Sequence, residues 1–151
     1  MSESNPIRIF VTHLFSEHPD YQRVFEYLES ANNFFYINCS DPEAIPPSGG
    51  QEALKETLLT QIRNSEVVIV IGTMYSENRD LIAYQLDAAE ASNIPLVGLE
   101  AFGGLGNVPE DVAARCAEMV GWNDRLMVDA IRREARHEET QRWEVVEFDL
   151  S

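Results

Sequence analysis

Three apolar stretches of this chain are each followed directly by side chains that could do chemistry. If the stretches are parallel strands, these side chains meet at one edge of a sheet, where α/β proteins bind their ligands. Hydroxyl, imidazole, amide and thiol groups at such an edge can bind a phosphate-bearing ligand or take part in acid–base and nucleophilic chemistry. The candidate ligand-binding residues at this edge are Thr12, His13, Asn38, Cys39, Thr73, Met74 and Tyr75, with Arg79 as a further donor for phosphate.

Several known uses of such an edge do not fit the residues present. A phosphoreceiver needs an acidic pair after the first strand and an Asp ending the third, where this chain has Thr12-His13 and Gly72-Thr73. A dinucleotide fingerprint needs G-x-G-x-x-G after the first strand, and the chain lacks it there. The segment 103–106, Gly-Gly-Leu-Gly, lacks the Lys and Ser/Thr of a P-loop and predicts a turn.

The histidines and cysteines leave two interpretations open. His13 and Cys39 follow strands that should be neighbours, so a Cys–His nucleophilic pair is one reading. A capping histidine beside a small buried thiol is the other. His18 and His137 have no partner at metal-ligand spacing, so no metal site is predicted.

The elements that must position these residues alternate in type along the chain. Asp20 and Asn123 are expected N-caps, and the links are long enough for right-handed crossovers. The pattern predicts an α/β, flavodoxin-like three-layer sandwich with a five-stranded parallel sheet in the order 2-1-3-4-5. The expected strands are 7–11, 34–37, 66–72, 94–99 and 118–122, and the expected helices are 20–31, 51–63, 78–92, 109–117 and 123–136.

The domain is expected to span residues 1–136, followed by an acidic tail at 137–151. Within the tail, Trp143 to Leu150 has a β-like pattern, and an edge strand and a loosely ordered tail both remain open.

Charge and composition exclude several classes of partner. Asp and Glu number 26 against 11 Lys and Arg, which gives a net charge of −15 and disfavours nucleic acid and anionic membranes. Two cysteines make no disulfide framework and indicate a reducing compartment. The longest apolar run, 67–71, is too short to span a membrane, so a cytoplasmic location is expected.

Four blocks of sequence resemble bacterial TIR-like domains, in order and with plausible spacing. The blocks are Ile-Phe-Val-Thr-His at 9–13 followed by Tyr21 and Leu28, the run from Gln61 to Tyr75, Ile-Pro-Leu-Val-Gly at 94–98, and Val-Gly-Trp-Asn at 120–123 followed by Ala-Ile-Arg at 130–132. The resemblance runs from about residue 7 to residue 136. It is greatest to the TIR-like family that includes the signal-producing subunit of the Thoeris antiphage system.

The resemblance implies a site on the helix after the third strand. That family carries a W-x-x-x-E pattern there, and its Glu is the catalytic carboxylate that cleaves the nicotinamide–ribose bond of NAD+. On this chain the Trp position falls on Leu81 and the Glu position on Gln85. Cleavage passes through an oxocarbenium-like state that a carboxylate stabilises and a neutral amide does not. Loss of one such electrostatic group costs about 10²–10³ in rate.

Three functions therefore remain open. The preferred one is a nucleotide-signalling or antiphage-defence domain with weakened catalysis, which takes NAD+ or a related nucleotide as ligand or substrate without a tightly bound cofactor. Its expected protein partners are a second TIR-like chain or an effector. The alternatives are an active NAD+ glycohydrolase or ADP-ribosyl cyclase, with Glu77, Asp80 or Asp87 replacing the carboxylate, and a nucleoside deoxyribosyltransferase. If Leu81 in place of Trp leaves the pocket intact, Gln85→Glu is expected to increase NAD+ cleavage, because a partly solvated Glu at position 85 should be ionised at neutral pH.

Overall fold

The protein folds around one parallel sheet, and its computed structural model describes residues 4–138. The sheet has five strands in the order β2-β1-β3-β4-β5, as predicted. The strands are β1 (Ile7–Val11), β2 (Tyr36–Asn38), β3 (Val67–Ile71), β4 (Leu96–Leu99) and β5 (Glu118–Val120). The helices are α1 (Pro19–Glu29), α2 (Gly50–Arg63), α3 (Arg79–Ala91), α4 (Glu110–Arg115) and α5 (Asp124–Arg136), with short 3₁₀ helices η1 (Gly72–Ser76) and η2 (Phe102–Gly104).

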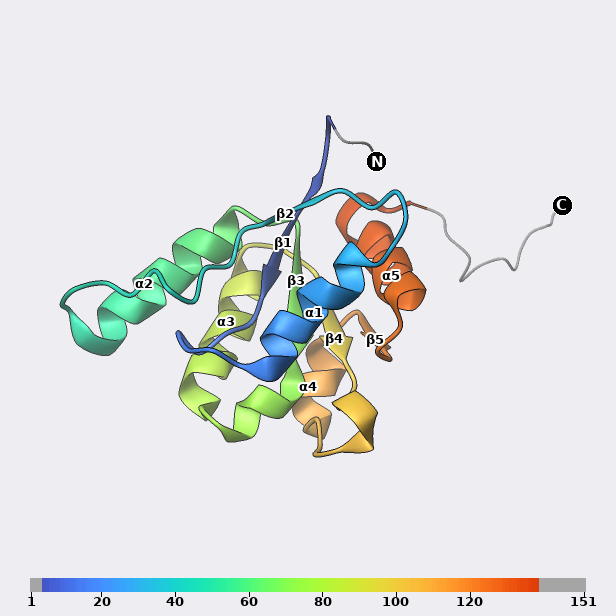
Figure 1. The fold of residues 1–151 in the computed structure, drawn as a ribbon. Helices are drawn as coiled ribbons and strands as arrows, with labels where there is room; N and C mark the ends of the chain where they lie inside the picture. The colour runs from blue at the N-terminus through green and yellow to red at the C-terminus, as the bar shows by residue number, and fades with distance from the viewer. Residues whose placement is uncertain (1–3, 139–151) are drawn as a thin grey trace, which may run out of the picture.

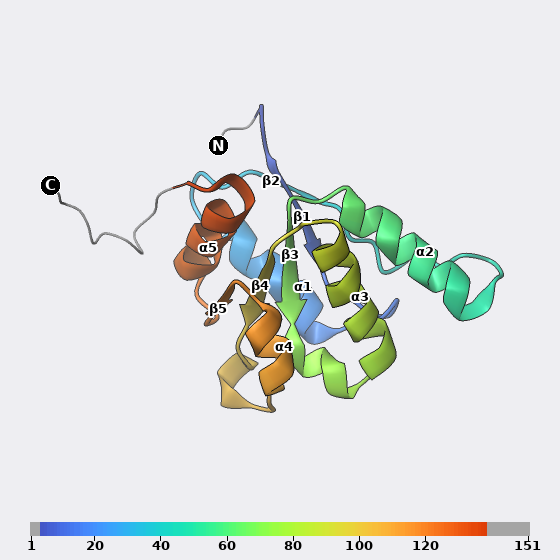
Figure 2. The same cartoon turned by 180° about the vertical axis from the view of Figure 1, so that it is seen from behind.

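Two helical layers cover the two faces of the sheet. Helices α1 and α5 pack against each other on one face, while α2, α3 and α4 lie on the other (Figure 1; Figure 2). The five residues of β3 are all buried, because this strand lies between β1 and β4 and is covered on both faces. The parallel strands end at one edge, toward η1 and η2 at the bottom of Figure 1. This carboxyl edge is where the sequence places the candidate residues.

The local differences from the expected elements have simple causes. The second strand is Tyr36–Asn38 rather than 34–37, because Ile7 pairs with Tyr36 and the buried Phe34 packs into the core before the strand begins. The N-cap of α1 is His18, not Asp20, because Pro19 already lies in the first turn and the His18 ring accepts a hydrogen bond from the Asp20 amide. Asn123 caps α5 as predicted, through the Leu126 amide.

Two further expectations concern the ends of elements and the tail. The segment between the expected strand 66–72 and the expected helix 78–92 forms the 3₁₀ helix η1. The Gly103–Gly106 segment is a turn, as predicted, and three of its glycines have positive φ. The possible strand at 143–150 lies outside the described residues. Across residues 4–138, none of the helices has the length and apolar character needed to cross a bilayer.

Candidate functional site at the carboxyl edge of the sheet

Gln85 lies in the middle of α3 and is fully buried beneath the end of β1. Its Oε1 accepts a hydrogen bond from the His13 backbone N–H at 3.1 Å. Its Nε2 donates to the backbone carbonyls of His13, at 2.8 Å, and Leu81, at 3.2 Å. The expectation of a partly solvated group at this position is therefore wrong. The amide satisfies the N–H and C=O of His13, which lie just past the end of β1, and a buried main-chain group left without a partner is costly.

The His13 side chain is also buried, and its two ring nitrogens have different roles. Nδ1 accepts a hydrogen bond from the Phe15 backbone N–H at 3.2 Å. Nε2 therefore carries the proton and donates to Gln61 Oε1 at 3.0 Å. Burial lowers the pKa of His13, although the Gln61 hydrogen bond and the nearby Asp41 oppose this shift. The imidazole is thus held neutral in a single tautomer.

This lowered pKa predicts a pH dependence of stability. Below the usual pKa of 6.5, the unfolded chain takes up a proton that folded His13 resists, so the free energy of unfolding falls as the pH drops from 6.5. The contribution is at most about 1.4 kcal/mol per pH unit. Urea unfolding of the wild type and of His13→Gln between pH 5.5 and 7.5 measures it. Below pH 6.5, the free energy of unfolding should fall less steeply with decreasing pH in His13→Gln than in the wild type. Equal slopes would contradict the assignment of this pH dependence to His13.

A cavity of about 490 Å³ opens beside His13, between the loops that follow β1 and β2. Aromatic, amide and hydroxyl groups form much of its wall, which suits a base and a ribose. Among the described residues, no Lys, Arg or His lines this cavity, and three carboxylates do. We call this cavity the carboxyl-edge pocket; it is lined by Phe15, Ser16, Glu17, Tyr21, Gln22, Asn38, Ser40, Asp41, Pro42, Glu43 and Ile45.

The predicted site residues fall into two groups. One group is buried and supports the edge from below: Thr12, His13, Met74, Leu81 and Gln85. In this group the Thr12 hydroxyl accepts a hydrogen bond from the Ile71 backbone N–H at 2.9 Å, which ties β1 to β3. The other group is wholly or partly exposed: Asn38, Cys39, Thr73, Tyr75 and Arg79. Of all ten, only Asn38 lines the carboxyl-edge pocket.

Cys39 and His13 do not form a nucleophilic pair in this structure. The Cys39 thiol contacts the Asn64 carbonyl at 3.5 Å, while the His13 ring is bonded to Gln61 and Phe15. Burial raises the pKa of Cys39, which lowers the fraction of reactive thiolate. The arrangement matches the reading of a small, partly buried thiol.

The carboxylates considered as replacements for a catalytic Glu are engaged elsewhere. Glu77 accepts from the His18 ring at 2.8 Å, which joins the start of α1 to the segment before α3. Asp80 lies 3.2 Å from Lys55. Asp87 binds Arg115 at 2.6 Å on α4. None of these three lines the carboxyl-edge pocket.

Sequence reasoning did not identify Phe15, Tyr21 and Gln61 as site residues. Tyr21 hydrogen-bonds Ser40 at 2.8 Å and receives a hydrogen bond from Asn38 at 3.2 Å, so it closes the pocket between the two loops. A polar Gln61 beside the apolar positions of α2 is the signal that could have revealed it. Buried polar groups generally have a specific partner, and here the partners are loop groups.

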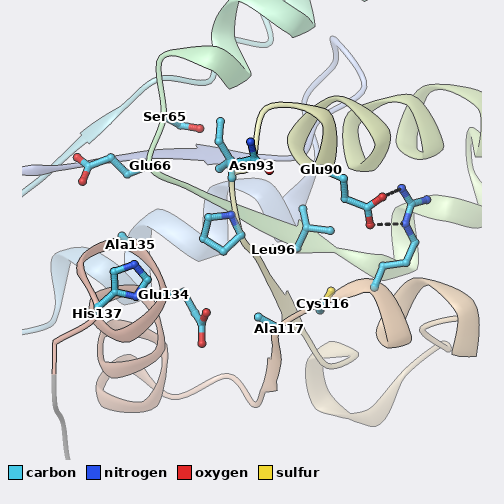
Figure 3. A pocket seen from close by; sticks show the side chains of 13 residues that line it. Ser65, Glu66, Glu90, Asn93, Leu96, Cys116, Ala117, Glu134, Ala135 and His137 are labelled. Carbon is cyan, nitrogen blue, oxygen red and sulfur yellow. Dashed lines mark hydrogen bonds and ion pairs between the residues drawn. The ribbon is translucent and has the colours of Figure 1, made fainter.

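A larger cavity of about 710 Å³ lies at the opposite, amino-terminal edge (Figure 3). It is bordered by the C-terminal ends of α3, α4 and α5, which carry partial negative charge. Glu66, Glu90 and Glu134 add full negative charge. Glu66 is paired with Arg8 and Arg136, and Glu90 is paired with Arg115, which also lines this cavity. An anionic ligand is therefore disfavoured there. The residues that carry the resemblance to an enzyme site lie at the other edge.

No group of three or more His, Cys, Asp and Glu within residues 4–138 is arranged to hold a metal ion. The side chains that line the carboxyl-edge pocket offer hydrogen bonding, aromatic stacking and carboxylate electrostatics.

The strand order and two helical layers define a flavodoxin-like α/β domain of the TIR-like type. The family model for the TIR-like domain of the Thoeris protein ThsB matches residues 10–102, which is more than half of the chain, and the chain belongs to that antiphage-defence family. The match includes His13, Gln61 and Gln85 but not the Val-Gly-Trp-Asn block at 120–123. A comparison with curated proteins gives no match.

Proposed function

We propose that this TIR-like domain serves antiphage defence by binding an NAD-derived nucleotide at the carboxyl-edge pocket, and that it cleaves NAD+ slowly or not at all. The observation that carries the proposal is the state of Gln85. The position that holds the family's catalytic carboxylate has a neutral amide, buried and fully used in supporting the His13 main chain. Such a group supplies no charge to an oxocarbenium-like state.

The pocket itself supports retained binding. Phe15 and Tyr21 offer ring surfaces, and Asn38 and Ser40 offer hydrogen-bonding groups, which suit a base with its ribose. The carboxylates in the wall disfavour phosphate inside the pocket. The phosphates of a bound nucleotide therefore point out toward solvent, where backbone amides of the flanking loops are the candidate donors. Arg79, the donor expected from the sequence, is exposed and donates to the Tyr75 hydroxyl at 3.1 Å.

The first experiment measures cleavage and binding separately. The purified protein is incubated with NAD+, and nicotinamide release is followed by chromatography against a protein-free blank. We expect release at the blank level while calorimetry detects binding of NAD+ or ADP-ribose. Nicotinamide release above the blank that is abolished by Gln85→Ala would contradict the proposal.

A matched pair of variants tests the place of binding. Ile45 lines the pocket and is 56% exposed, whereas Ile37 is 49% exposed on β2 and does not line it. Losing the apolar contact of Ile45 costs about 1 kcal/mol, or roughly fivefold in affinity. Ile45→Ala should therefore weaken NAD+ binding in calorimetry while Ile37→Ala leaves it unchanged. Equal affinities of the two variants would place the ligand elsewhere.

One observation favours a second candidate, an active NAD+ glycohydrolase. Glu17, Asp41 and Glu43 line the pocket, and a carboxylate close to the ribose is the group that such a reaction needs. In that case nicotinamide release would exceed the blank and fall with Glu17→Gln, Asp41→Asn or Glu43→Gln. It would persist in a folded Gln85→Ala variant.

A further inference from the structure

Gln61 is a buried glutamine on α2 that binds both loops of the site without lining the pocket. Its Oε1 accepts hydrogen bonds from the His13 Nε2–H and from the Asp41 backbone N–H, both at 3.0 Å. Its Nε2 donates to the Asp41 carbonyl at 3.2 Å. Gln61 thus connects the imidazole after β1 with the pocket wall after β2.

The two buried glutamines of the site use the same hydrogen-bonding device. Gln85, from α3, pairs with the N–H and C=O of His13. Gln61, from α2, pairs with the N–H and C=O of Asp41 and also with the His13 ring. Because α2 and α3 pack side by side, the two amides hold both loops against one rigid helical layer.

We propose that Gln61 is the positioning residue of the carboxyl-edge pocket, acting through Asp41 and His13 to keep the two loops in the arrangement that binds ligand. A loop that is already ordered pays less conformational entropy when the ligand binds. Loss of the Gln61 bonds therefore weakens binding although no ligand contact is removed. The identity of the ligand rests on the proposed function, but the positioning role does not.

The main test replaces Gln61 by Met, which has a similar length and makes none of these bonds. Gln61→Met should accelerate hydrogen exchange at the Asp41 amide and weaken ADP-ribose binding about tenfold, which corresponds to about 1.4 kcal/mol. The matched control is Ser65→Ala. Ser65 is buried just past the end of α2, and among residues 4–138 its hydroxyl donates only to the Ile62 carbonyl, away from the carboxyl-edge pocket. The control should change neither quantity.

A second variant gives a measurement that would not change if Gln61 had only a structural role. Gln61→Glu keeps an acceptor for His13 but places a negative charge beside it, which raises the pKa of the imidazole. The titratable groups that already face this ring are Asp41 and Tyr21. The pKa of His13 should therefore be higher in this variant than in the wild type, as measured by NMR of the ring. In Gln61→Glu, the hydrogen-exchange rate of the Asp41 amide should change over the pH range in which His13 titrates. This change should come in addition to the pH dependence of exchange that the wild type shows.

The outcomes separate the two proposals. If the wild type binds no ADP-ribose, the proposed function fails, while exchange at Asp41 and titration of His13 still test the positioning role. Wild-type protection of the Asp41 amide in Gln61→Met would overturn the inference. If that variant does not fold, an Asp41 exchange rate in Gln61→Glu that does not follow the His13 titration overturns it instead.

Discussion

Replacing Gln85 by Glu should destabilise the protein by about 3 kcal/mol at pH 7, with no gain in NAD+ cleavage. One carboxylate oxygen would still accept from the His13 N–H. The other would face the His13 and Leu81 carbonyls, which now receive hydrogen bonds at 2.8 Å and 3.2 Å. An ionised carboxylate cannot donate to either. Because the side chain lies beneath β1 and outside the pocket wall, its carboxylate would not contact a bound ribose.

The penalty should depend on pH in a defined direction. Burial and the two facing carbonyls raise the pKa of the new carboxyl above its unfolded value of about 4.3. The penalty is therefore smallest near pH 4.5, where a protonated Glu can donate to His13, and it grows as the pH rises. Urea unfolding at several pH values measures it, with the exposed Gln51→Glu as the control that stays near the wild type. Wild-type stability of Gln85→Glu together with increased nicotinamide release would refute this assignment.

Replacing Gly72 by Ala should cost about 1–3 kcal/mol of folding free energy through overpacking. Gly72 is buried where β3 passes into η1, and a Cβ there would lie 2.5 Å from Cγ1 and 3.2 Å from Cγ2 of Val108. Valine has a stiff side chain and cannot easily turn aside. The segment 72–76, which carries Met74 and Tyr75, would have to shift.

The same change at Gly121 supplies the control. The nearest atom to a Cβ on Gly121 is Oε1 of Glu100 at 3.7 Å, an ordinary contact. The free energy of unfolding of Gly121→Ala should therefore lie within about 0.5 kcal/mol of the wild-type value. Equal losses in the two variants, measured by urea unfolding, would show that close packing against Val108 is not what requires glycine at position 72.

The fold was predictable because its signals are local. The unbroken apolar run at 67–71 indicates a strand buried on both faces, and alternating strands and helices restrict the crossovers. The sheet order and the cap at Asn123 follow from such patterns. The start of β2 does not follow from a local pattern, because Phe34 and Tyr36 are equally suited to a strand and only packing decides between them.

The site was predictable as an edge but not as a set of contacts. Residues that follow strands do gather at the carboxyl edge, yet burial depends on what the loops place over them. Leu81 and Gln85 turn inward because the segment after β1 lies against α3. The pairing of Gln61 with Asp41 joins positions 20 residues apart, one on α2 and the other in the preceding loop, which has no periodicity. No local pattern encodes such a contact.

The most direct test of the account is an NMR titration of the isotope-labelled protein with NAD+ and with ADP-ribose. The account predicts that the ligand changes the chemical shifts of backbone amides mainly at the carboxyl-edge pocket, at Phe15, Tyr21, Asn38 and the segment 40–45. The signals of the Gln85 side-chain amide should stay as they are in the ligand-free protein. Shifts confined to the larger cavity at the amino-terminal edge of the sheet, which Asn93 and Ala117 line, or to the Gly103–Gly106 turn would contradict it.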